Sequence, residues 1–313
     1  MLCPTHVEAK PKGKNTFVRT LSYDSSYLPE FLNSNRGMNH FLTEYTGLVP
    51  GGLFDLGNWL MTFGVDHWAS RLLYLGAFES MIFLTGLYYP VMLANHEFGH
   101  GTRLIAIGVY PTFYFGPGSS PENNIFSYFL LAHGNLWSGG ATRGAGRFDS
   151  SIGADNGNML DSALMIQNAG GMNQNMYLAE SMGERIYYEN GHIAMLPYYV
   201  RSKLEVSRYF HSPGGGGGLG DFTDILQRYG ERNFSNIGLR DFEWGGYLSL
   251  FGSATTYAFL FKSRFLPDGD PAVYPLEIGP VRLPDLSFYM CSSGITYRLS
   301  SGIRWKTKAA TVT

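Results

Sequence analysis

The stretch "LLYLGAFESMIFLTGLYYPVMLA", residues 72 to 94, is the most apolar part of the chain, and a prediction of the architecture starts from it. Glu79 is its one charged residue. At a rise of about 1.5 Å per residue, a helix of this length crosses a hydrocarbon layer about 30 Å thick. We therefore predict a membrane-associated helix that is kinked near Pro90, continues to about Ile107 and stops at Gly108.

The composition points in the same direction. Charged residues make up 15% of the chain, against about 25% in ordinary soluble domains, while aromatic residues also reach 15% and there are 40 glycines. Aromatic rings settle at bilayer interfaces and glycines allow helices to pack closely. We expect membrane lipid as a partner and a membrane of a bacterial cell envelope as the location. The alternative is a soluble, tyrosine-rich protein in which Glu79 marks a buried helix.

The charge balance argues against nucleic acid as a partner. The formal net charge of the 313 residues is −2, and no long run of basic residues interrupts the sequence. A protein of this charge has no broad electrostatic attraction to a phosphate backbone. We expect no nucleic-acid binding.

A candidate metal site follows the apolar stretch directly, in "NHEFGHGTRL", residues 95 to 104. His96, Glu97 and His100 form the pattern H-E-x-x-H. On a helix, positions four residues apart share a face, so both imidazoles can bind one Zn²⁺ at about 2.0–2.1 Å. The glutamate between them can take a proton from a metal-activated water, as a general base does. We predict His96 and His100 as zinc ligands and Glu97 as the catalytic residue.

A second helix is predicted over residues 160 to 190, where apolar residues recur at steps of three and four. Its glycine pair at 170 and 171 permits a close approach by another helix. A catalytic zinc site needs a third protein ligand, and we assign Glu180 to that place. Glu184 then steadies a ligand histidine, and Asn173 binds substrate. The alternatives are a solvated pair of glutamates and an asparagine that bonds helices together in the core.

The segment "HEFGHGTRLIAIGVYPTFYFGPG", residues 96 to 118, resembles the active-site segment of the site-2-type intramembrane metalloproteases, a family of HExxH zinc metallopeptidases. The resemblance implies two histidine ligands and a glutamate base on a helix that ends in a Gly-Val turn, here Gly108-Val109, before a sheet segment. It also implies a third ligand of the Asp-Gly type. Asp268, in "FLPDGDP", is the nearest match, so Glu180 and Asp268 remain alternatives for the third ligand.

The C-terminal part of the chain changes its period. In "ITYRLSSGIRW", residues 295 to 305, apolar and polar side chains alternate, which predicts a strand and is also typical of membrane β-strands. The predicted fold class is α+β: a membrane-associated helical core carrying the H-E-x-x-H helix, followed by a β-rich C-terminal part. The predicted divisions are a disordered or extended segment (1–20), a helical metal-site domain (21–211), a glycine-rich loop (212–222) and the β-rich part (223–313).

Three functions fit these observations. The first is a zinc-dependent, membrane-associated peptidase that cuts a protein or peptide substrate. The second is a non-catalytic structural or assembly component of a membrane or envelope complex, partnered by other envelope proteins or by copies of itself, in which the H-E-x-x-H is vestigial or structural. The third is a zinc site that hydrolyses a lipid or small molecule. Metal content separates the first from the second, and the class of substrate separates the first from the third.

Overall fold

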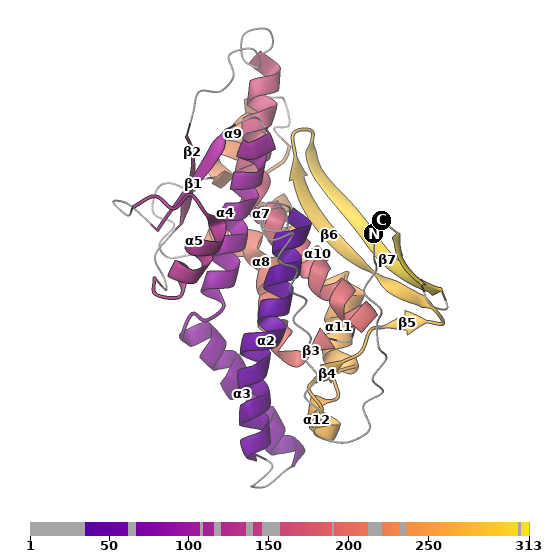
Figure 1. Cartoon of the computed structure of the whole chain (residues 1–313). Helices are drawn as coiled ribbons and strands as arrows, with labels where there is room; N and C mark the ends of the chain where they lie inside the picture. The colour runs from indigo at the N-terminus through magenta and orange to yellow at the C-terminus, as the bar shows by residue number, and fades with distance from the viewer. Residues whose placement is uncertain are drawn as a thin grey trace.

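A computed structural model gives the fold of the protein as mostly helical α+β with a C-terminal antiparallel sheet. It describes residues 35–61, 67–106, 109–115, 120–135, 140–145, 157–189, 191–211, 221–231, 236–305 and 308–312. The predicted N-terminal segment 1–20 and residues 212–220 of the glycine-rich loop lie outside the described residues. In Figure 1, α2, α4 and α7 lie close together in the middle of the molecule, and the long C-terminal strands run along one side of the helices.

The first half of the chain forms α2 (Asn35–Met61), α3 (Trp68–Leu84), α4 (Tyr89–Ala106), β1 (Tyr110–Tyr114), α5 (Ile125–Ala132) and β2 (Ala141–Ala145). The second half begins with α7 (Gly157–Glu189), β3 (Gly191–His192), η1 (Ile193–Met195), α8 (Leu196–His211), α9 (Asp221–Glu231), α10 (Leu239–Phe251), α11 (Ala254–Phe261) and α12 (Phe265–Asp268). It ends with the strands β4 (Ala272–Val273), β5 (Glu277–Ile278), β6 (Val281–Cys291), β7 (Gly294–Trp305) and β8 (Lys308–Val312).

The apolar stretch is not one helix but two. A turn at residues 85–88, in which Gly86 has a φ of +71°, separates α3 from α4, and the two helices meet at a bend of 51°. The kink predicted at Pro90 is therefore misplaced. Pro90 lies in the first turn of α4, where a missing N–H leaves no helical hydrogen bond unmade. None of the described helices is alone long and apolar enough to cross a membrane, and α3 with α4 meets that test only as a bent pair.

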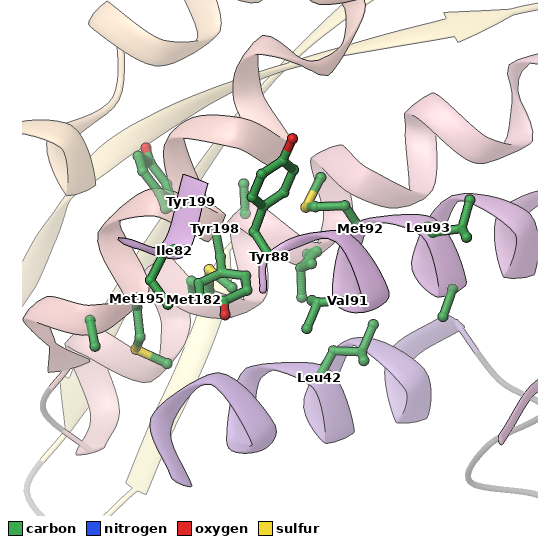
Figure 2. Packing of buried hydrophobic residues seen from close by; sticks show 14 of the residues in the cluster. Leu42, Ile82, Tyr88, Val91, Met92, Leu93, Met182, Met195, Tyr198 and Tyr199 are labelled. Atoms are coloured by element: carbon green, nitrogen blue, oxygen red, sulfur yellow. The ribbon is translucent and has the colours of Figure 1, made fainter. Parts of the chain in front are cut away.

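Helix α4 forms the centre of the hydrophobic core. Every residue from 90 to 101 is buried. Val91 and Met92 on α4 belong to the same buried cluster as Leu42 on α2, Met182 on α7 and Tyr198 on α8 (Figure 2). A helix that is buried on all sides can hold polar side chains in fixed positions, because its neighbours leave them few alternative rotamers.

Two glycines set the contact between α4 and α7. A Cβ atom on Gly99 would lie 2.2 Å from the carbonyl oxygen of Gly170, and one on Gly170 would lie 2.6 Å from the carbonyl oxygen of Gly99. The helix backbones therefore touch at the H-E-x-x-H motif, so the predicted close approach of another helix to the glycine pair of α7 is confirmed. This contact brings the next turns of α7 against the two histidines.

The C-terminal sheet has the strand order β5-β6-β7-β8, with all neighbours antiparallel. The strand predicted from the alternation at residues 295–305 is confirmed as part of β7. Strands begin later than predicted, however, because most of residues 239–268 form the helices α10 to α12. Aromatic residues are enriched in strands, but here α10 packs against α8 as a helix.

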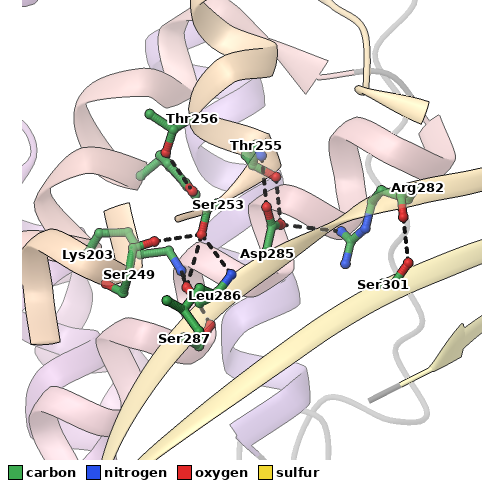
Figure 3. A network of polar contacts seen from close by, with 11 residues as sticks. Lys203, Ser249, Ser253, Thr255, Thr256, Arg282, Asp285, Leu286, Ser287 and Ser301 are labelled. Atoms are coloured by element: carbon green, nitrogen blue, oxygen red, sulfur yellow. Dashed lines mark hydrogen bonds and ion pairs between the residues drawn. The ribbon is translucent and has the colours of Figure 1, made fainter. Parts of the chain in front are cut away.

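Side chains from the helices close the edge of β6 that faces away from β7. Ser253 accepts a hydrogen bond from the backbone N–H of Leu286 at 3.0 Å, and Lys203 donates to the carbonyl of the same residue at 2.7 Å (Figure 3). Asn173 pairs with both backbone groups of Met290, at 2.7 and 2.9 Å. These bonds satisfy backbone groups that a neighbouring strand would otherwise pair.

Candidate metal centre

Three side chains come together where α4 meets α7 and α9. The Nε2 atoms of His96 and His100 are 3.1 Å apart. Asp221, the first residue of α9, places Oδ2 3.0 Å from Nε2 of His100 and 3.4 Å from Nε2 of His96. Within the described residues these three form a group that could hold a metal ion, with both histidines buried and Asp221 half-buried.

The separations match what one small metal ion requires. Ligand atoms about 2.0–2.1 Å from a tetrahedral Zn²⁺ lie about 3.3 Å from one another. The three separations in the group, 3.0, 3.1 and 3.4 Å, bracket that value. Two nitrogen donors and one carboxylate oxygen also form a ligand set that zinc accepts, and they leave its fourth position for water or substrate.

The ring of His100 is oriented by its other nitrogen. Its Nδ1 atom lies 2.7 Å from the backbone carbonyl oxygen of Gln167 on α7. A carbonyl only accepts, so Nδ1 carries the proton and donates it, and the neutral ring keeps its lone pair on Nε2. A carbonyl in this place is a common partner of metal-binding histidines, because it fixes both the tautomer and the ring orientation.

Gly171 leaves the room in front of the two imidazoles. A Cβ atom at this position would lie 2.6 Å from Nε2 of His96 and 2.7 Å from Nε2 of His100. The space it would occupy borders the nitrogens that face Asp221. An ion bound by the three side chains therefore needs the residue at position 171 to have no side chain.

The electrostatics of the group favour positive charge. Burial alone would lower the pKa of His100, but the adjacent Asp221, with further contributions from Glu97 and the carbonyl of Gln167, raises it to about 9. Burial alone would raise the pKa of Asp221, but the two imidazoles hold it well below its usual range. A pocket that stabilises an imidazolium and a carboxylate in this way also stabilises a bound cation, which competes with the proton for the same place.

Glu97 lies on α4 beside the two histidines, and it points to β2. Thr142 on β2 donates a hydrogen bond to Oε2 of Glu97 at 2.6 Å. A Cβ atom on Gly140, just before this strand, would come within 2.6 Å of Oε1. The carboxylate is thus buried between its own helix and the strand, and the charge of Glu97 acts on His100.

Helix α9, which carries Asp221, is attached to the rest of the molecule at two levels. Near its start, Asn168 on α7 donates to Oδ2 of Asp224 at 3.3 Å. Near its end, the hydroxyl of Tyr229 reaches the β6–β7 turn, where its one proton is shared between the carbonyl oxygens of Cys291 and Gly294 at 2.8 and 2.9 Å. The C-terminal hairpin therefore helps to hold the third member of the group in place.

The structure does not bring the two predicted third ligands to the histidines. Glu180 is buried on α7 on the side of the sheet, and its carboxylate lies 3.4 Å from the guanidinium of Arg298 on β7. Asp268 ends α12 and accepts a hydrogen bond from Nε of Arg264 at 2.7 Å, with both side chains exposed. The carboxylate that lies beside His96 and His100 is that of Asp221.

The two residues predicted to support the site also lie outside the His96–His100–Asp221 group. Glu184 is half-buried on α7, one turn beyond Glu180. Asn173 is buried, and its amide pairs with the backbone of Met290 on β6. Asn173 therefore bonds a helix to the sheet, whereas the alternative expected from the sequence had it bonding helices together.

Asp221 was missed because it falls inside residues 212–222, which composition marks as a glycine-rich loop. The described structure starts α9 at this residue, and its first turn contains two aspartates, Asp221 and Asp224. A carboxylate in the first turn of a helix ordinarily indicates only a favourable interaction with the helix dipole. The sequence could therefore have indicated that a helix starts directly after the glycines. It could not have indicated that this helix lies beside the histidines.

Comparison of the chain with protein-family models, with curated proteins and with solved structures found no match.

Proposed function

We propose that this protein is a zinc-dependent peptidase that works at a membrane surface. His96, His100 and Asp221 hold the ion, and Glu97 is the general base. The observation that carries the proposal is the agreement between the three ligand-atom separations and those around one tetrahedral ion. A bound zinc ion would supply Lewis acidity and lower the pKa of a water molecule at the open position.

Residues of the chain orient the ligands and transfer the proton. The backbone carbonyl of Gln167 keeps the Nε2 lone pair of His100 directed at the ion. Glu97 is one residue from a ligand, so its carboxylate can take a proton from the attacking water and pass it to the leaving amine. Thr142 holds that carboxylate at 2.6 Å and limits its rotation.

The strand next to Glu97 supports a peptide as the substrate. In the part of the chain that the structure describes, β2 has a strand partner on one side, β1, with which it pairs from Ala141 to Ala145. An extended peptide can add to the other side of such a strand through backbone hydrogen bonds. Thr142 links this strand to the base, so a peptide bond held there would lie near Glu97.

The outer surface of α2 and α3 supports a location at lipid. It exposes large apolar side chains, with Leu73 76% and Leu84 80% exposed; the others are Leu48, Val49, Leu53, Leu56, Trp59, Leu60, Trp68 and Leu72. Among residues 48–61 and 68–84, the charged side chains turn inward. Asp55 pairs with His192 at 3.0 Å, Arg71 donates to the carbonyl of Pro267 at 2.6 Å, and Glu79 is half-buried. An apolar surface without exposed charge suits the hydrocarbon boundary of a bilayer.

Metal content and peptide hydrolysis test the catalytic part together. We expect about one zinc per chain by elemental mass spectrometry, lost in His96→Ala, because each ligand contributes to a three-residue site. We expect the wild-type protein to cleave members of a mixed peptide library, and Glu97→Gln to keep its zinc and lose the cleavage. A Glu97→Gln protein that cuts peptides at the wild-type rate excludes Glu97 as the base.

The outcomes also separate the other functions. Zinc bound by a wild-type protein that cuts no peptide favours a structural site in a membrane or envelope complex. Zinc together with cleavage of ester-containing lipids, and not of peptides, favours a lipid hydrolase. Absence of zinc after reconstitution removes the basis of the proposal.

Vesicle flotation tests the membrane part separately. We expect the protein to float with vesicles of phosphatidylcholine and phosphatidylglycerol, and the double variant Leu73→Glu/Leu84→Glu to remain in solution, because a charge resists transfer into hydrocarbon. Leu299→Glu is the matched control, since Leu299 is 61% exposed but lies on β7. Equal flotation of all three proteins would contradict lipid contact through α3.

A further inference from the structure

Helices α4 and α8 run side by side in the same direction. The hydroxyl of Tyr198, at the start of α8, donates to the carbonyl of Leu87 just before α4 at 3.4 Å. One turn further along both helices, Ser202 lies 3.6 Å from the sulfur of Met92. The next turn of each helix leads to Glu205 on α8 and His96 on α4, because α-helical residues three and four positions apart share a face.

Glu205 on α8 is a buried carboxylate. The residue is 9% exposed, and within the described residues its Oε2 atom accepts no hydrogen bond. Arg201 on the same helix places Nε 3.5 Å from Oε2. Burial raises the pKa of Glu205 to about 7, and the charge of His96 acts in the opposite direction.

The two ring nitrogens of His96 point in opposite directions. Its Nε2 atom faces His100 and Asp221, so Nδ1 points away from the ion position. Histidines that bind metals almost always donate the proton of the second nitrogen to a carboxylate or a carbonyl. His100 has the carbonyl of Gln167 in that role.

We propose that Glu205 is the positioning carboxylate of His96: in the metal-loaded protein it accepts the Nδ1–H of His96 and fixes the tautomer that binds the ion through Nε2. This inference rests on the proposed metal site and extends it from α4, α7 and α9 to α8. With the cation bound, the charge of Glu205 also partly offsets the charge brought into the buried site. In the absence of metal, Arg201, one turn earlier on α8, balances the negative charge of the carboxylate.

The test measures metal affinity in the full chain, independently of hydrolysis. Zn²⁺ or Co²⁺ is titrated in competition with a chelating dye into the wild-type protein, Glu205→Gln and Glu205→Met. We expect about a 10–100-fold loss of affinity in Glu205→Gln and a larger loss in Glu205→Met, because glutamine can still accept a hydrogen bond but carries no charge. Glu180→Gln, which removes another buried carboxylate on the side of the sheet, is the control with wild-type affinity.

The thermal stability of the metal-free variants separates positioning from a structural role. A buried carboxylate costs desolvation, so we expect the metal-free Glu205→Gln protein to melt at the wild-type temperature or above it. Wild-type metal affinity in Glu205→Gln overturns the inference while the proposed function stands. A loss of affinity that appears only with a lower melting temperature overturns it as well. A wild-type protein that binds neither ion overturns both.

Discussion

Gly171 on α7 faces His96 on α4 so closely that a Cβ atom on the glycine would lie 2.6 Å from the Nε2 atom of the imidazole. The two residues belong to helices that meet through Gly99, three residues after His96, and Gly170, which directly precedes Gly171. The same glycine-lined contact therefore serves two purposes: it packs the helices together, and it keeps open the space that the proposed metal ligands face.

Substituting Gly171→Ala should remove metal binding and leave the fold intact. The added methyl group meets the ends of two buried imidazole side chains, which have to swing by a small angle but yield more easily than a backbone carbonyl, so we expect the free energy of unfolding to fall by about 1 kcal/mol. The swing misplaces both nitrogens, and we expect a loss of zinc affinity larger than the ~10–100-fold typical of changes around a ligand. Dye competition and thermal melting measure the two effects.

Gly99→Ala provides the contrasting variant. Its Cβ would lie 2.2 Å from a backbone carbonyl oxygen, which cannot move without shifting the helix. We expect a loss of stability of about 1–3 kcal/mol or more. If Gly171→Ala instead behaves like Gly99→Ala, with stability and metal affinity falling together, the glycine at 171 serves packing alone.

The three candidate third ligands give a second prediction. We expect Asp221→Ala to reduce zinc affinity by more than about 100-fold, because it removes a direct ligand. Glu180→Ala and Asp268→Ala should retain wild-type affinity, since the first carboxylate pairs with Arg298 and the second with Arg264. Elemental analysis of the three purified variants after dialysis shows how much zinc each one retains. A Glu180→Ala protein that loses its zinc would restore the ligand expected from the sequence.

A third prediction concerns the attachment of α9. Tyr229 is fully buried, and its hydroxyl donates to two carbonyls of the β6–β7 turn. Tyr229→Phe should lower the free energy of unfolding by about 1–3 kcal/mol, because both carbonyls lose a partner. It should also weaken zinc binding, since α9 carries Asp221. Unchanged affinity in a destabilised Tyr229→Phe protein would show that Asn168 and the apolar contacts of α9 suffice to hold the ligand.

The buried Lys203 predicts how stability depends on pH. Burial lowers its pKa from 10.5 to about 8 in the folded protein. Between these two values the unfolded chain binds a proton that the folded protein does not, so the free energy of unfolding rises with pH across this window. The rise is on the order of 2–3 kcal/mol from this group alone.

Lys203→Met is the variant that isolates this contribution, because tyrosines also titrate at high pH. Denaturant unfolding of both proteins at several values between pH 7 and pH 10.5 gives their difference in stability. We expect the free energy of unfolding of the wild type to increase relative to that of Lys203→Met as the pH rises. A difference that stays constant with pH would mean that Lys203 keeps its ordinary pKa, stabilised by Leu286 and Ser287, to which it donates hydrogen bonds.

The sequence predicted those parts of the site and fold that depend on near neighbours. His96 and His100 share a face because they are four residues apart on one helix, and the alternation at residues 295–305 is itself the period of a strand. The long helix of residues 157–189 was likewise readable from its apolar spacing, although its predicted start was three residues late.

The third member of the proposed metal site could not be predicted in the same way. Asp221 reaches the histidines because α9 packs on α7, and that contact depends on Asn168, Tyr229 and the distant C-terminal hairpin. Nothing within a few residues of Asp221 distinguishes it from an aspartate that only begins a helix. The break between α3 and α4 was also not predicted. The proline rule places a kink at Pro90, whereas the chain turns at residues 85–88.

The distance along the chain between His100 and Asp221 has a consequence for folding. An ion bound by both closes a loop of about 120 residues, and in a flexible chain such a closure carries an entropic cost that grows only slowly with length. In the unfolded chain the paired histidines would hold an ion without the aspartate, so tight loading has to follow the docking of α9. The ion would then bind late in folding. It would slow the unfolding of the folded protein and would not help to start folding.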